Sequence, residues 1–98
     1  MREFVLIAKF EVKEGAPEIL INAGLREGAA VLRDEPGCRV FDIVVSGDGD
    51  HKGLFYEVFD DEVAREKHRE SPHLVEFRSA IEALTIEWEI TYFWRVTQ

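Results

Sequence analysis

Apolar residues follow a strand-like pattern at the start of the chain and a helical pattern directly after it. Phe4 to Val12 is rich in apolar and β-branched residues, which is typical of a buried strand. Pro17 then suits the first turn of a helix that runs to about Arg33. Its predicted buried stripe consists of residues at helical spacing, Ile21, Leu25, Gly28 and Leu32. Gly24 and Gly28 are weak helix formers, so we expect them to let this helix lie close to a sheet.

The middle of the chain predicts a hairpin. Pro36-Gly37 ends the first helix, and Cys38 to Val45 reads as a second strand. Within it, Phe41 shares one face with Ile43 and Val45. Residues 46–53 are polar and predict a turn, and Leu54 to Phe59 returns as the third strand.

Two short helices and a long strand complete the pattern. Asp60 or Asp61 caps a helix that runs to about Glu70, and Ser71-Pro72 begins the next one. The buried stripe of that second helix is predicted to be Leu74, Phe77, Ile81 and Leu84. Thr85 to Thr97 is predicted to be the last strand, and its apolar face holds Ile86, Trp88, Ile90, Tyr92, Trp94 and Val96.

The predicted element order is β-α-β-β-α-β with the second helix broken. This is the ferredoxin-like plan of the α+β class, an antiparallel sheet with helices on one face only. Because the first and last strands carry apolar residues on both faces, the other face also needs a cover. A second copy of the sheet would provide it, so we predict a homodimer whose interface includes the apolar face of the last strand.

Composition narrows the classes of partner. The 98 residues fit a single domain spanning 1–98, and the net charge of −8 argues against nucleic acid or an anionic membrane as partner. No apolar run approaches the ~20 residues of a membrane span, and the N-terminus lacks a signal-peptide cleavage site. A lone cysteine, Cys38, cannot form an intrachain disulfide and is expected to be buried and inert. These features favour a cytoplasmic protein.

Two histidines are candidates for acid–base chemistry. His68 titrates near neutrality and suits a general acid or base, although a histidine bonded to a carboxylate that fixes the helix is the structural alternative. Because the predicted helix of His68 is short and polar, His68→Ala should cost at most about 1 to 2 kcal/mol of stability. His73 follows five residues later, and the Ser71-Pro72 break allows the two rings to converge. The alternative for His73 is a cap on the preceding helix.

Glu57 is the third candidate. It shares a strand face with Phe55 and Phe59, where a carboxylate needs a partner or a proton. It suits a base of raised pKa in a pocket, or an ion pair with a histidine or Arg65 that holds strand to helix.

The aromatic residues are expected to be mostly core, with a few lining an apolar pocket between sheet and helices. The predicted pocket walls are Phe41, Phe55, Phe59, Phe77 and Trp88. Asp48, Asp50 and His51 lack the spacing of a calcium loop and its distal glutamate, so they indicate a solvated turn and no metal site.

The segment from residue 57 to residue 77 resembles the antibiotic biosynthesis monooxygenase-like (ABM) domain, whose members often read E-x-[WF]-x-[DS]-x-x-A-x-x-x-H-x-x-[ST]-x-H-x-x-x-[FH]. The matching residues are Glu57, Phe59, Asp61, Ala64, His68, Ser71, His73 and Phe77. A further match lies upstream, where Glu35-Pro36-Gly37-Cys38 is followed by Phe41-Asp42. The resemblance extends over nearly the whole chain and implies a dimeric α+β barrel.

The resemblance also implies what chemistry to expect. The family includes cofactor-free oxygenases of aromatic polyketides and quinols, haem-degrading oxygenases, and enzymes that process a phosphorylated bacterial signal molecule. The haem-degrading branch uses an asparagine, a tryptophan and a histidine at positions that hold Ala8, Phe59, and Phe77 or Arg78 here. The chain is more similar to the quinol-oxygenase and signal-processing branches, in which no flavin, haem or metal cofactor is required.

These observations lead to one functional hypothesis and two alternatives. The hypothesis is a cofactor-independent monooxygenase acting on a small aromatic, quinol-like or other oxygenated substrate, with His68 as acid or base and His73 and Glu57 supporting it. The alternatives are an isomerase of a small phosphorylated sugar-derived signal and a non-catalytic ligand-binding dimer. A histidine of perturbed pKa that faces open volume would distinguish an enzyme from a ligand-binding dimer. Oxygen consumption would distinguish a monooxygenase from an isomerase.

Overall fold

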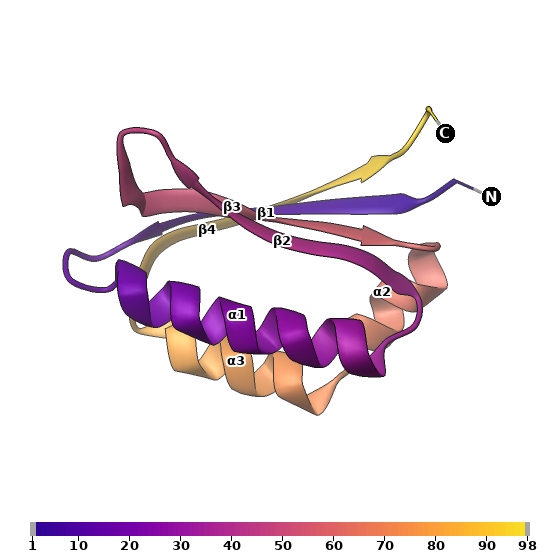
Figure 1. The fold of residues 1–98 in the computed structure, drawn as a ribbon, viewed down its shortest axis with the longest axis horizontal. Coiled ribbons are helices and arrows are strands. Elements are labelled where there is room, and N and C mark those ends of the chain that lie inside the picture. Colours follow the sequence, from indigo (N-terminus) through magenta and orange to yellow (C-terminus); the bar gives the residue numbers. More distant parts are fainter. Residues whose placement is uncertain (1, 98) are drawn as a thin grey trace.

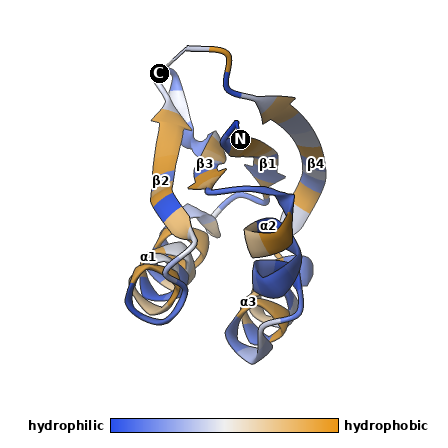
Figure 2. Cartoon of the chain, turned by 90° about the vertical axis from the view of Figure 1, so that its right-hand side faces the viewer, coloured by the Kyte–Doolittle hydropathy of each residue, from blue (hydrophilic) through white to orange (hydrophobic). Residues whose placement is uncertain are grey.

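The computed structural model describes residues 2–97 and has the predicted order of elements (Figure 1). The strands are β1 (Phe4–Val12), β2 (Cys38–Ser46), β3 (Gly49–Phe59) and β4 (Thr85–Trp94); the helices are α1 (Pro17–Asp34), α2 (Glu62–Arg69) and α3 (Pro72–Glu82). Neighbouring strands are antiparallel, in the order β2-β3-β1-β4. All three helices lie on one face of the sheet (Figure 1), and α1 and α3 run side by side beneath it (Figure 2). The α+β ferredoxin-like prediction is confirmed.

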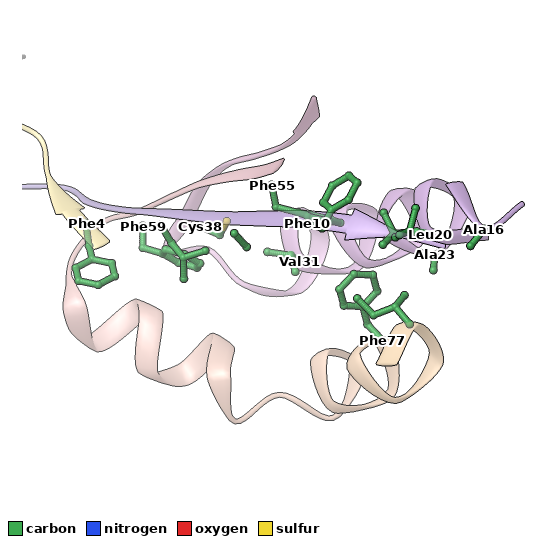
Figure 3. Close-up of a cluster of buried hydrophobic side chains, with 14 residues drawn as sticks. Phe4, Phe10, Ala16, Leu20, Ala23, Val31, Cys38, Phe55, Phe59 and Phe77 are labelled. Carbon is green, nitrogen blue, oxygen red and sulfur yellow. The ribbon is translucent and has the colours of Figure 1, made fainter. Parts of the chain in front are cut away.

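The core fills the space between sheet and helices. Phe55 of β3 lies at its centre, with ring centroids 5.7 Å from Phe10 and 5.6 Å from Phe77 of α3. Figure 3 shows the buried cluster that surrounds these rings. Glu57 stands opposite Leu6 on the same face of the sheet as Phe55, so the fold places a carboxyl group among core side chains.

The glycines of α1 allow the helix to approach the sheet, as predicted. A Cβ atom on Gly24 would lie 2.6 Å from Ile43 Cδ1, and one on Gly28 would lie 2.9 Å from Phe41 Cδ1. The predicted buried stripe, however, is right only at Gly28, because Leu25 is 60% exposed and Leu32 52% exposed. The buried face is instead Leu20, Ala23, Gly24, Glu27, Gly28 and Val31. The small residues set the phase of the helix, since only they fit against the rings of β2 and β3.

The hairpin between β2 and β3 is longer than predicted. Most of the polar segment 46–53 belongs to the strands, and Ser46 pairs with Gly49 across a two-residue loop. Gly49 has φ 154°, a conformation that favours glycine. Polarity there reflects strands that project into solvent, not a loop.

The break between α2 and α3 is built as predicted. Asp61 caps α2 by accepting a hydrogen bond from the Ala64 N–H at 2.9 Å. Ser71 caps α3 by accepting from the Leu74 N–H at 3.4 Å, and its hydroxyl donates to the His68 carbonyl at 2.8 Å. One serine thus ends one helix and begins the next, which fixes the angle between the segments that carry the two histidines.

The apolar stripe of β4 faces the helices rather than the opposite side of the sheet. Trp88 stands opposite Phe10, and Trp94 stands opposite Phe4. Trp88 and its neighbour Ile90 pack against the core, which removes them from the predicted subunit interface. The strand ends at Trp94, short of the predicted Thr97, and its last residues keep apolar surface exposed.

Candidate functional site

His68 lies near the C-terminal end of α2 and is almost fully buried, with 2% of its surface exposed. Its Nδ1 lies 2.9 Å from Glu35 Oε1, and its Nε2 lies 3.5 Å from Glu57 Oε1. The imidazole therefore stands between a carboxyl group of β3 and one that directly follows α1.

His73 lies in the first turn of α3 and continues the same line of groups. Its Nε2 is 2.8 Å from Glu35 Oε2, and its Nδ1 is 2.9 Å from Glu27 Oε1. The two histidine rings are 6.2 Å apart, and Glu35 contacts both of them. We refer to the resulting series as the acid–imidazole chain: Glu57, His68, Glu35, His73 and Glu27.

Burial controls the protonation of this chain. Burial raises the pKa of Glu57 to about 8, with smaller contributions in the same direction from Glu27 and Glu35, while the positive charge of Arg65 opposes the rise. Burial likewise raises the pKa of Glu27 despite its bond to His73. Burial lowers the pKa of His68, and this outweighs the opposite effect of the Glu35 carboxylate.

The hydrogen-bond arrangement follows from these directions. His68 is neutral at neutral pH, and its Nδ1–H donates to the Glu35 carboxylate. Its Nε2 is then free of a proton and faces the Glu57 carboxyl group. The tautomer that Glu35 selects leaves His68 ready to accept a proton from the Glu57 side.

The two ends of the acid–imidazole chain reach different cavities. Glu57 and His68 line a cavity of about 30 Å³ between sheet and helices, here called the inner cavity. Its remaining lining residues are Leu6, Ala8, Phe41, Phe55, Arg65, Leu74, Phe77, Arg78, Trp88 and Ile90. His73 and Glu27 line a cavity of about 260 Å³ between α1 and α3, here called the helix cavity. The acid–imidazole chain therefore links the inner cavity to the helix cavity, which is the groove between α1 and α3.

The antibiotic biosynthesis monooxygenase family model matches residues 3–80. The chain belongs to this family. No curated protein matches the sequence.

Solved structures agree with the ABM fold. A Pseudomonas aeruginosa protein is 28% identical with a TM-score of 0.86, and the match covers 99% of this chain and 97% of that one. A Nitrosomonas europaea protein described as a candidate antibiotic biosynthesis monooxygenase is 23% identical with a TM-score of 0.91, over 96% of this chain and 90% of that one. A Caulobacter crescentus protein with the same description is 18% identical with a TM-score of 0.92, over 98% and 92% of the two chains.

Most of the predicted site residues gather around the inner cavity. Phe41, Phe55, Phe77 and Trp88 line it, together with Glu57 and His68. Phe59 does not line it, because its fully buried ring packs against the imidazole of His68, with ring centroids 5.3 Å apart. His73 lies outside it as well, and pairs with Glu27 and Glu35 instead of capping α2.

The helix that carries His68 is short and polar, as predicted, but the His68 side chain itself is buried. The α2 helix is polar on its outer face, but its inner face buries His68 and Arg65. Glu57 pairs with His68, one of the partners proposed from the sequence, and not with Arg65 among the ion pairs of residues 2–97.

Sequence reasoning missed two members of the acid–imidazole chain. Glu27 lies on the α1 stripe between Gly24 and Val31, so a correctly phased helix would have revealed a carboxyl group on a buried face. From sequence alone, Glu35 stands out only as part of the upstream match to the ABM domain. Its role depends on the chain reversal after α1, which no local spacing reveals.

Other chemically suggestive residues stand apart from the site. Asp48, Asp50 and His51 are exposed at the hairpin tip, and residues 2–97 contain no group of three His, Cys, Asp or Glu side chains suited to a metal ion. Cys38 is buried, and burial raises the pKa of its thiol to about 12. Within the same residues, no helix has the length and apolar character needed to cross a membrane.

Proposed function

We propose that this ABM protein is a cofactor-independent monooxygenase whose acid–imidazole chain removes the proton of a substrate hydroxyl group. The observation that carries the proposal is the Glu57–His68 pair, which faces the inner cavity at one end and connects through Glu35 to the helix cavity at the other. A histidine of lowered pKa that faces open volume favours an enzyme over a purely ligand-binding dimer.

The contacts assign different roles to Glu57 and His68. Both ring nitrogens of His68 already face carboxyl groups, so a substrate hydroxyl is expected to give its proton to Glu57. Glu57 passes a proton to His68 Nε2, and His68 releases its Nδ1 proton to Glu35. Glu35 then gives a proton to His73 Nε2, and His73 Nδ1 gives one to Glu27. A base whose pKa lies near the working pH is the efficient choice for such a transfer.

The substrate class follows from the balance of the reaction. An ionised quinol supplies the electrons that reduce dioxygen, so one oxygen atom enters the ring and the other leaves as water. A quinol and dioxygen thereby give a hydroxyquinone and water, with all the hydrogen atoms of the water coming from the quinol. The inner cavity is lined by Glu57 together with aromatic side chains, which suits the hydroxyl-bearing edge of such a ring.

Oxygen consumption tests the proposal. We expect oxygen uptake with a panel of benzene and naphthalene quinols, rising as the pH increases through about 8 because Glu57 ionises there. Glu57→Gln should lower turnover by roughly 10²- to 10⁴-fold. Glu87→Gln, an exposed carboxylate on β4, is the matched control and should leave turnover unchanged. Absence of uptake over the whole panel, or full activity in Glu57→Gln, would contradict the proposal.

An isomerase of a small phosphorylated sugar-derived signal is the second candidate. The same pair supports it, since proton transfer beside a carbonyl needs a carboxylate base and no dioxygen. Conversion of such a substrate in the absence of oxygen would favour this candidate.

We also propose that the protein is a homodimer formed through the sheet face opposite the helices. Val44 of β2 and Phe93 of β4 lie on this face, and both are 49% exposed. The central strands add Ile7 and Tyr56 there, both partly buried. Figure 2 shows hydrophobic colouring over much of β2, whereas hydrophobic and polar residues alternate along β4.

A further inference from the structure

Arg65 carries a positive charge into the interior without an ion-pair partner among residues 2–97. Its side chain is only 6% exposed, and the buried Nε and Nη1 atoms have no hydrogen-bond partner among residues 2–97. No ion pair of the described residues includes it, although Glu57 lines the same cavity. Its guanidinium contacts the face of the Tyr92 ring, with Cζ 5.7 Å from the centroid. A guanidinium stays charged at all physiological pH values, and such groups are almost never buried without a counterpart.

A second donor without a partner faces the same cavity. The Nε1 atom of Trp88 is buried and has no hydrogen-bond partner among residues 2–97. Arg65 and Trp88 come from different elements, α2 and β4, yet both line the inner cavity. A neutral apolar ligand would leave both donors unsatisfied, whereas a ligand with an oxygen anion offers an acceptor for such N–H groups.

The size of the inner cavity limits what it can hold. A volume of about 30 Å³ accommodates roughly one or two water-sized groups, so the oxygen end of a ligand fits but a ring does not. A larger pocket of about 410 Å³ lies beside it, between α3 and the start of β4, and is here called the outer pocket. Arg78 and Trp88 line both spaces, so the two lie next to each other. The outer pocket has room for the ring that the inner cavity excludes.

We propose that the inner cavity is an oxyanion subsite, in which Arg65 and the Trp88 indole N–H bind a carboxylate or ionised hydroxyl oxygen of an aromatic ligand whose ring occupies the outer pocket. This inference rests on the proposed function in one respect only, namely that the bound anion is the substrate after it has lost its proton. In that setting Arg65 stabilises the negative charge that Glu57 creates by removing the proton. Ligand binding itself requires neither dioxygen nor turnover.

Benzoate and benzamide test the subsite, because they share a ring and differ in charge. The chain has two tryptophans, so a Trp94→Phe variant leaves Trp88 as the sole indole reporter. We expect benzoate to change Trp88 fluorescence and raise the melting temperature of this variant, and benzamide to bind at least about tenfold more weakly. This comparison needs no change at Arg65 and holds even if substitutions there prevent folding.

Substitution of Arg65 then locates the charge. Arg65→Met should weaken benzoate binding at least about tenfold, and Arg65→Lys should retain part of it because the charge remains without the planar fork. Arg69→Met, the same substitution on an exposed side chain of the same helix, should bind as the parent does. 4-Nitrophenol distinguishes the second anion source, since its absorbance reports ionisation. It should ionise at a lower pH when bound to the parent than when bound to Arg65→Met.

The outcomes separate this inference from the proposed function. Equal binding of benzoate and benzamide, or unchanged benzoate binding in Arg65→Met, overturns the oxyanion subsite even if quinols consume oxygen. Selective, Arg65-dependent binding of benzoate without any oxygen uptake supports the subsite and contradicts the monooxygenase proposal. A shift in 4-nitrophenol ionisation without benzoate binding supports an ionised hydroxyl group as the anion and excludes the carboxylate.

Discussion

At the scale of single residues, Glu57 places an ionisable carboxyl group in the protein interior. A glutamine has the same shape and carries no charge, so it would be easier to bury there. The folded-state pKa of Glu57, about 8, lies well above the ordinary value of 4.5. Between these two pH values the folded protein holds a proton that the unfolded chain has released. Stability therefore falls as the pH rises from 4.5 to about 8, and remains lower above it.

Replacing Glu57 by glutamine should remove this dependence on pH. We expect the wild-type free energy of unfolding to fall by at most about 4 to 5 kcal/mol from this group between pH 4.5 and 8, and the Glu57→Gln protein to show a flatter profile. Urea midpoints measured across that pH range provide the comparison, with exposed Glu87→Gln as control. Parallel profiles for the wild type and Glu57→Gln would show that Glu57 titrates normally.

His68 should matter to folding as well as to activity. His68→Ala removes a buried partner of Glu35 and Glu57, so we expect it to cost about 3 to 5 kcal/mol of stability. This is comparable with the about 3 to 5 kcal/mol expected for Phe77→Ala in the core. His51→Ala, at the exposed hairpin, should change stability by no more than about 0.5 kcal/mol. Chemical denaturation of the three variants tests the ranking, which fails if His68→Ala resembles His51→Ala.

At the scale of elements, the positions of β1, β2 and the α2–α3 break were accessible from sequence because each has a local physical cause. Apolar runs that include β-branched residues define these two strands, and Asp61, Ser71 and Pro72 define the helix ends. The phase of α1 was not accessible in this way. Its buried face is chosen by close contact with the rings of Phe41 and Phe55, which overrides the larger apolar residues Leu25 and Leu32.

The contact of α1 with the sheet predicts an unusual response to Gly28→Ala. In an open helix this change is stabilising by roughly 0.5 to 1 kcal/mol. Here the new methyl group would lie 2.9 Å from Phe41 Cδ1, so we expect a net loss of about 1 to 3 kcal/mol. Asn22→Ala, on the exposed face of the same helix, should be neutral or slightly stabilising. A more stable Gly28→Ala protein would mean that the ring of Phe41 moves aside at little cost.

At the scale of the whole molecule, the order of elements predicted the topology, but the composition of the site could not be read from the chain. Glu57 and His68 lie in one motif and were found together. Glu27 and Glu35 are 46 and 33 residues from their histidine partners, His73 and His68. Their meeting depends on how α1 packs against α3 and on where the chain turns into β2. These contacts depend on tertiary packing, which local patterns in a single sequence do not reveal.

The sheet face opposite the helices gives the prediction for assembly. We expect sedimentation at micromolar concentration to report a dimer, with an interface of at least the ~1,200 Å² of specific assemblies. A Val44→Lys, Phe93→Lys double variant should sediment as a folded monomer, because it places charges on that face. Ile19→Lys, on an α1 residue that is 55% exposed, is the control and should leave the dimer intact. A monomeric wild type, or a dimer that tolerates both lysines, would contradict the proposed interface.

The acid–imidazole chain ends in two separate cavities, and this has a consequence for a bound complex. A ring seated against Trp88 and Arg78 would close the inner cavity to bulk water at the moment when its hydroxyl must lose a proton. His73, whose side chain is 25% exposed, contacts solvent on the far side of the helix layer. A bound hydrophobic substrate would therefore exclude water from the inner cavity without blocking the release of its own proton. The proton would leave through His73 between α1 and α3, while the substrate anion stays shielded from water.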